Sequence, residues 1–227
     1  MTTTIKSLKS YKTPLRYPGG KSRACKKMEP YIPDLRDYEV YYEPFLGGGS
    51  VALHITKKYP KLKIVVNDLY EPLYNFWLQL QVNGDYVHSE LQQLKSRFPD
   101  RGSARGLFED AKEKLYDLDI VDKDRAVCFY IINKCSFSGL TESSSFSPQA
   151  SDANFSMRGI DKLPVYSKLI EDWYITNVDY RHLLGDKEKT FIYLDPPYDI
   201  KDNLYGRKGS MHKKFVHDNF SKACEIY

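Results

Sequence analysis

A short run of β-forming residues near the end of the chain, Thr190 to Leu194, stops abruptly at the motif Asp195-Pro196-Pro197-Tyr198. Proline has no backbone N–H and fixes its φ angle, so the run cannot continue as a paired central strand. We therefore predict a rigid ledge at the carboxyl end of a strand. Asp195 and the Pro196 carbonyl can accept both hydrogens of a planar amino group, and Tyr198 can stack on a flat heterocycle. The motif is typical of a site that holds the exocyclic amine of a base, although four residues alone could equally form a proline-stiffened turn.

A glycine-rich turn, Glu43-Pro44-Phe45-Leu46-Gly47-Gly48-Gly49-Ser50, follows a second strand candidate, Val40 to Tyr42. Three consecutive glycines allow positive φ angles and let the backbone approach a ligand closely. The apolar run Val51 to Ile55 then indicates a helix whose N-terminus faces that ligand. The turn has neither GxGxxG spacing nor the Gly-Lys-Ser/Thr ending of a phosphate-binding loop. It therefore favours a nucleoside-like cofactor that lacks phosphate.

A third motif, Asn67-Asp68, ends the β-rich run Lys61 to Val66. An acid at the end of the second strand of such a unit typically binds ribose hydroxyls. Alone, Asn-Asp after a strand is more often a simple turn. Its place behind a glycine turn favours the ribose role.

These motifs, together with Leu15-Arg16-Tyr17-Pro18-Gly19-Gly20-Lys21, resemble the Dam-like DNA adenine methyltransferases, which use S-adenosylmethionine. The motifs occur in that family's order, and the resemblance covers roughly residues 13 to 222. It implies an α/β fold, a three-layer Rossmann-like methyltransferase sandwich with the cofactor at the carboxyl edge of the strands. It also implies direct attack by the amine of a flipped adenine on the cofactor's methyl group, without a metal.

The resemblance assigns roles to particular residues. It implies that Tyr17, Lys21, Asp68 and Asp195 contact the cofactor and that Asp195 also serves the target adenine. From the ledge itself we predict the catalytic residues Asp195, Pro196 and Tyr198. Further cofactor contacts are predicted for Glu43, Phe45, Gly47, Gly49, Asp179 and Tyr180.

A target-recognition insert is predicted over residues 84–160, between two parts of a catalytic domain, residues 1–83 and 161–227. Apolar periodicity predicts helices at Tyr86 to Arg97, Leu107 to Leu118 and Arg125 to Asn133, with Arg101 to Gly106 as a linker. A long polar loop follows Gly139. It is either a flexible surface excursion or a strip of donors and acceptors that reads base edges.

DNA contacts are predicted for a set of basic and polar residues: Arg101, Arg105, Asn133, Lys134, Ser138, Arg158, Lys213 and Lys214. Family members that methylate GATC commonly carry an arginine shortly after the Gly-Leu pair. Thr141-Glu142 stands there instead, which argues against GATC as the recognised sequence.

The charge distribution is uneven, although the 227-residue chain has a net charge of only +4. Residues 1–36 hold nine Lys and Arg against two acids, and a second basic stretch covers residues 207–214. Basic segments beside a base-binding ledge favour contacts with double-stranded DNA, although each lysine alone could be ordinary surface. The sequence contains no run of about 18 apolar residues, the length that a membrane helix needs. Its cysteines lack the spacing of metal ligands. We expect a cytoplasmic, monomeric protein of a bacterium or phage.

Three other functions are alternatives to adenine methylation. Cytosine-ring methylation needs a cysteine nucleophile, generally after proline, and the chain has no Pro-Cys pair. RNA or protein-glutamine methyltransferases can carry a similar ledge, but generally lack both the Tyr-Pro-Gly-Gly-Lys motif and a helical insert. A catalytically dead DNA-binding relative is the third alternative. It is suggested by an apparent truncation, because the helix expected at Phe215 to Ile226 should lead into a further strand.

Overall fold

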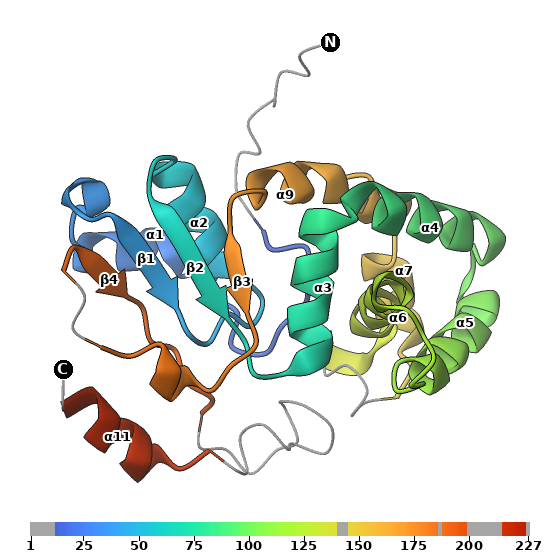
Figure 1. Ribbon diagram of the computed structural model, residues 1–227. Coiled ribbons are helices and arrows are strands. Elements are labelled where there is room, and N and C mark those ends of the chain that lie inside the picture. The colour runs from blue at the N-terminus through green and yellow to red at the C-terminus, as the bar shows by residue number, and fades with distance from the viewer. Residues whose placement is uncertain (1–11, 140–144, 186–187, 199–214, 226–227) are drawn as a thin grey trace.

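The computed structural model describes residues 12–139, 145–185, 188–198 and 215–225. Within these ranges lies a four-stranded sheet in the order β3-β2-β1-β4 (Figure 1). Every pairing in it is parallel. The strands are β1 (Val40–Glu43), β2 (Lys63–Asn67), β3 (Tyr174–Thr176) and β4 (Thr190–Ile192). The predicted α/β class is confirmed, and all strands end at the same edge.

Parallel neighbours need crossover connections, and α2 (Ser50–Lys58) supplies the one between β1 and β2. This helix and the short α1 (Cys25–Met28) lie behind the sheet in Figure 1. Strand β4 is shorter than the predicted run to Leu194, although Tyr193 N still donates to Tyr42 O at 2.8 Å. The two prolines that follow cannot donate, so the ladder ends there.

A group of helices occupies the other half of the molecule (Figure 1). They are α3 (Glu71–Val82), α4 (Gly84–Arg97), α5 (Arg101–Lys114), α6 (Asp122–Cys135), α7 (Pro148–Asn154), α8 (Met157–Ile160) and α9 (Leu163–Leu169). Helix α6 lies in the middle, packed against α3, α4, α5 and α7. Its residues from Ala126 to Cys135 are all buried, as expected for a helix surrounded by other helices.

The sheet and the helices share one hydrophobic core. Trp77 of α3 connects the two parts. Its ring lies 5.7 Å from that of Trp173, and its Nε1 donates to the Gly47 carbonyl at 3.1 Å. The division into a catalytic domain and a recognition insert is therefore not accompanied by separate cores, and it stays a prediction.

Two segments predicted to be irregular are partly helical. Helix α5 begins at Arg101, where a linker was expected, because the Asp100 side chain caps it by accepting from Gly102 N and Ser103 N. The polar loop after Gly139 contains α7 and α8, which are capped by Ser147 and Ser156. Short polar side chains stabilise helix N-termini, so these helices form despite their few apolar residues.

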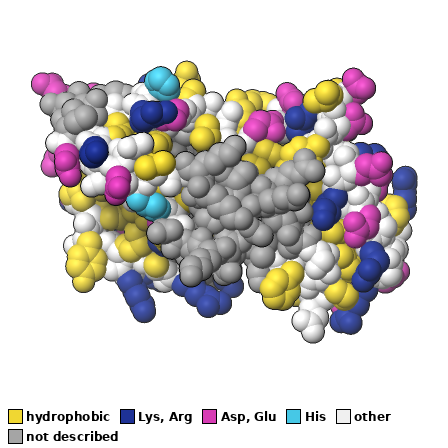
Figure 2. All heavy atoms as spheres, turned by 90° about the horizontal axis from the view of Figure 1, so that it is seen from below, with side chains coloured by type: hydrophobic (Ala, Val, Ile, Leu, Met, Phe, Trp, Pro, Cys, Tyr) yellow, Lys and Arg dark blue, Asp and Glu magenta, His cyan; other side chains and the backbone are white. Residues whose placement is uncertain are grey.

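The last described element is α11 (His217–Glu225), below the carboxyl ends of the strands in Figure 1. Figure 2 views the molecule from below and shows Lys and Arg side chains interspersed with Asp and Glu around the rim. Among the described residues, no helix combines the length and apolar character needed to cross a membrane.

Candidate active site

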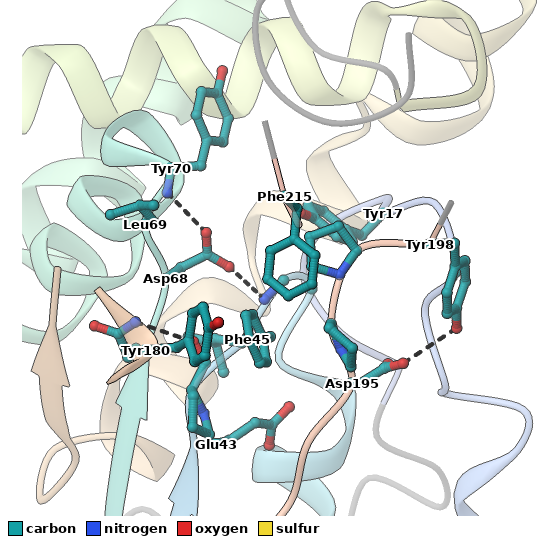
Figure 3. Close-up of a pocket in the computed structure, with 18 of the residues that line it drawn as sticks. Tyr17, Glu43, Phe45, Asp68, Leu69, Tyr70, Tyr180, Asp195, Tyr198 and Phe215 are labelled. Carbon is teal, nitrogen blue, oxygen red and sulfur yellow. Dashed lines mark hydrogen bonds between the residues drawn. The ribbon is translucent and has the colours of Figure 1, made fainter. Parts of the chain in front are cut away.

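A cavity of about 400 Å³ opens at the carboxyl edge of the sheet (Figure 3). Segments that follow all four strands line it, together with residues 17–21 and the region around Phe215. In the strand order β3-β2-β1-β4, the chain passes from β1 to β2 and β3 on one side, whereas β4 lies on the other side of β1. The strand order therefore reverses beside β1. Ligands in α/β folds bind at such a switch point.

The glycine turn after β1 has the conformation that its sequence predicted. Gly47 and Gly49 have φ angles of +51° and +68°, in the left-handed region that favours glycine. A Cβ atom at Gly47 would lie 2.7 Å from Cε1 of Tyr17, and one at Gly49 would lie 2.7 Å from Cζ2 of Trp77. Both the backbone conformation and the packing therefore require glycine.

Asp68 links the end of β2 to this turn. Its Oδ2 accepts from Gly47 N at 2.8 Å, and its Oδ1 accepts from Tyr70 N at 3.0 Å (Figure 3). Burial raises the pKa of Asp68 to about 6, although both backbone hydrogen bonds oppose the rise. Each carboxylate oxygen has a second lone pair, so Asp68 can still accept from a ligand hydroxyl.

The Asp-Pro-Pro-Tyr ledge lies on the opposite side of the cavity. Asp195 forms an ion pair with Lys21, and its Oδ1 accepts from the Tyr198 hydroxyl at 3.2 Å. Lys21 also donates to that hydroxyl. Burial lowers the pKa of Lys21, but its contacts with Asp195 and Tyr198 outweigh burial and raise it overall. Tyr198 as a whole residue is 41% exposed, so a flat ligand can reach it.

Glu43 forms part of the cavity wall at the end of β1. The side chain is buried, and its Oε2 accepts from the Tyr41 hydroxyl at 2.6 Å. Burial raises the pKa of Glu43 to about 8, and the nearby Asp195 contributes to the rise. Burial thus favours the protonated form of Glu43, which can donate a hydrogen bond within the cavity.

Four aromatic rings meet at the mouth of the cavity. Phe45 lies 5.4 Å from Tyr180 and 5.7 Å from both Phe215 and Phe220, measured between ring centroids. The sequence analysis missed Phe215, which lines the cavity. The sequence does show two aromatic residues, Phe215 and Phe220, around the start of the polar helix α11. No motif, however, indicates that this helix packs against the glycine turn.

The structure brings together all the residues predicted to serve the cofactor and the target base, because each of them lines this one cavity. The residues predicted to contact DNA are more scattered. Arg101 pairs with Asp152, Arg105 lies 5.3 Å from the Phe146 ring centroid, and Arg158 is exposed.

Two predicted DNA contacts are buried instead. Asn133 has no exposed surface, and its side-chain amide forms hydrogen bonds with the backbone of Arg16. In this structure it is therefore not positioned to contact DNA. Lys134 is 9% exposed, and burial lowers its pKa to about 8, with a contribution from Arg16. The Ser138 side chain, Lys213 and Lys214 lie outside the described residues.

A model of the D12 class N6 adenine-specific DNA methyltransferases matches residues 17–227. The chain belongs to this family. Among curated relatives, it is 27% identical over 202 residues to the type II methyltransferase M.MjaIII of Methanocaldococcus jannaschii, covering 81% of this chain and 68% of the relative. It is 24% identical to the modification methylase StsI of Streptococcus sanguinis, covering 90% and 32% of the two chains. It is also 24% identical to the type II methyltransferase M.CviBI of Paramecium bursaria Chlorella virus NC1A, covering 85% and 71%.

The family membership confirms the predicted adenine-specific DNA methyltransferase. It also gives the cavity its context. In this family member, the glycine turn and the acid–aromatic ledge line one and the same cavity.

Proposed function

We propose that this D12 family member binds S-adenosylmethionine in the 400 Å³ cavity and methylates the exocyclic amine of an adenine flipped out of double-stranded DNA. The observation that carries the proposal is the shared cavity, which has the glycine turn on one side and the Asp195 ledge on the other. Its volume lies within the range of about 300–1,000 Å³ usual for small-molecule sites. We also propose, as expected from the sequence, that the protein acts as a monomer in the cytoplasm.

The residues present fit this cofactor. Asp68 offers acceptors to ribose hydroxyls, and the rings of Phe45, Tyr180 and Phe215 offer an apolar wall to a purine. Lys21 and Glu43 supply polar groups toward the ledge side of the cavity. When bound, the cofactor supplies an electrophilic methyl group on a sulfonium.

The ledge activates the amine of the target base by position rather than by strong base catalysis. When the amine nitrogen is planar, its lone pair is delocalised into the purine ring, and the nitrogen is a poor nucleophile. Acceptors at Asp195 and the Pro196 carbonyl favour a more tetrahedral nitrogen, whose lone pair can be aligned with the methyl group. The proton released afterwards passes to Asp195 or water. Because Lys21 and Tyr198 already occupy Asp195, a target amine must share or displace those bonds.

The amine of a paired adenine is out of reach within a duplex, so the base must be flipped out of the stack. Tyr198 then supplies a stacking face, and base–aromatic stacking contributes about 1–3 kcal/mol per base. Arg101, Arg105 and Arg158, all exposed, remain the described candidates for phosphate or base contacts.

The test is incubation with labelled S-adenosylmethionine and mixed-sequence duplex DNA, followed by digestion and nucleoside analysis. We expect N6-methyladenine. Asp195→Ala and Tyr198→Ala should abolish turnover, whereas Tyr198→Phe should reduce it only slightly because stacking needs the ring and not the hydroxyl. Tyr174→Ala is the matched control, since Tyr174 is an exposed tyrosine that does not line the cavity. Methylcytosine as product, or normal turnover of Tyr198→Ala, would refute the proposal.

A further inference from the structure

The backbone of Arg16 is held by a side chain that lies 117 residues further along the chain. Asn133 Oδ1 accepts from Arg16 N at 2.9 Å, and Asn133 Nδ2 donates to Arg16 O at 2.6 Å. One amide therefore satisfies both backbone polar groups of a single residue. Asn133 is fully buried near the end of α6, and Arg16 is half-buried, so the two hydrogen bonds lie at the boundary of the core.

Two further contacts fix the same residue. Arg16 Nη1 donates to the Ser136 carbonyl at 2.6 Å, just beyond the end of α6. Gly139 has a φ of +72°, and a Cβ atom there would lie 2.7 Å from Arg16 Cβ and 2.9 Å from Arg16 O. Residues from α6 and the turn after it thus surround Arg16 closely. We call Asn133, Ser136 and Gly139 the Arg16 clamp.

The segment that the clamp holds leads directly into the cavity. Tyr17, the next residue, packs so closely on the glycine turn that a Cβ at Gly47 or Gly48 would lie 2.7 Å or 2.9 Å from its side chain. A turn closed by Gly20 N donating to Tyr17 O then carries the chain to Lys21. Lys21 pairs with Asp195. Within five residues after Arg16, the segment contacts both the glycine turn and the Asp195 ledge.

We propose that Asn133 is a positioning residue for the cofactor cavity. Through the Arg16 backbone it places Tyr17 against the glycine turn and Lys21 against the ledge, so that the helical insert sets the shape of the cavity even without DNA. This inference rests on the proposed function, since it assigns the cavity to S-adenosylmethionine. It gives Asn133 a role different from the DNA contact predicted from sequence.

A substitution at Asn133 has a defined local effect. Asn133→Leu keeps the branched shape and the number of heavy atoms of the side chain but leaves the N–H and C=O of Arg16 without their side-chain partners. Unpaired buried backbone groups are unfavourable, so residue 16 should move toward water and take Tyr17 with it. The glycine turn would then lose the ring that packs on it.

The experiment is calorimetric titration of the protein with S-adenosylhomocysteine, without DNA. We expect Asn133→Leu to weaken binding at least tenfold. The control is Asn75→Leu, which removes another buried asparagine whose Nδ2 donates to a backbone carbonyl, that of Asp122 at the opposite end of α6. Asn75→Leu should lower the melting temperature to a similar extent but leave the affinity of the folded protein unchanged.

A double-mutant cycle tests the route through Tyr17. Tyr17→Ala alone should weaken binding, and adding Asn133→Leu should have little further effect, because coupled residues are not additive. Should Asn133→Leu fail to fold, Gly139→Ala displaces Arg16 from the other side and should give the same loss. Wild-type affinity in Asn133→Leu or Gly139→Ala, or additive effects in the cycle, would overturn the positioning role. Failure of the wild-type protein to bind would instead count against the proposed function.

Discussion

At the scale of single residues, Asp68 combines two functions that a pH titration can separate. It holds the glycine turn and is proposed to accept from ribose hydroxyls, and its pKa is raised to about 6 by burial. Protonation below pH 6 removes the charged acceptor, so affinity for S-adenosylhomocysteine should fall as the pH is lowered from 7 to 5. Asp68→Asn should bind more weakly at pH 7, by about 1.5–3 kcal/mol, and lose this pH dependence. Calorimetry across this range would check both, and a flat wild-type profile would contradict the ribose assignment.

The buried position of Lys134 affects the stability of the fold, and we expect it to make the free energy of unfolding depend on pH. Burial lowers its pKa from 10.5 to about 8, so between these two values the unfolded state binds more protons than the folded state. The free energy of unfolding should therefore rise with pH across this window, by up to about 3 kcal/mol. Lys134→Met should stabilise the protein at pH 7 and abolish the rise. Urea unfolding at pH 7, 8.5 and 9.5 measures this, with the exposed Lys26→Met as a control that should keep the wild-type profile.

At the scale of elements, strand ends were easier to predict than the beginnings of helices. The glycine turn, Asn67-Asp68 and the Asp195 ledge were each expected after a strand, and each lies there. The start of α5 was missed because Gly102 and Gly106 suggested a linker and Ala104 is the only apolar side chain between Arg101 and Gly106. Asp100 is a recognisable N-cap residue in the sequence. A cap alone does not specify a helix, however, because most of the stability of a short helix comes from packing of its apolar face, and a local pattern does not show that packing.

Two glycines give opposite predictions for the stability of their helices. Gly49 begins α2 with φ +68°, and an added Cβ would meet Trp77 at 2.7 Å, so Gly49→Ala should destabilise the fold by about 1–3 kcal/mol. Gly106 lies exposed within α5 with no atom within 4 Å of an added Cβ. Gly106→Ala should therefore stabilise by up to about 1 kcal/mol. Chemical denaturation of both variants checks the pair, and equal effects would contradict this account of the glycine turn.

At the scale of the whole molecule, the site could be predicted where the sheet itself assembles it. Parallel strands bring their carboxyl ends to one edge, so motifs that are far apart in sequence meet without any further information. The position of Phe215 and the hydrogen bonds between Asn133 and Arg16 could not be predicted in this way. They depend on how a late helix and an internal helix pack against distant segments, and nothing in their local sequence specifies the partner.

The last prediction concerns the charge of the whole molecule. If the basic segments 1–36 and 207–214 contact phosphates, the logarithm of DNA affinity should fall linearly with the logarithm of salt concentration, whereas affinity for S-adenosylhomocysteine should barely change. The double variant Lys213→Ala/Lys214→Ala should reduce the steepness of that slope by about 2, since each phosphate contact contributes about 0.9. Lys61→Ala is the matched control, because Lys61 is exposed just before β2, at the opposite edge of the sheet from the cavity. Fluorescence anisotropy with labelled duplex DNA measures the slopes. Equal slopes for the double variant, the control and the wild type would show that Lys213 and Lys214 do not contact phosphates. The described arginines of the helical insert would then be the candidates for DNA contact.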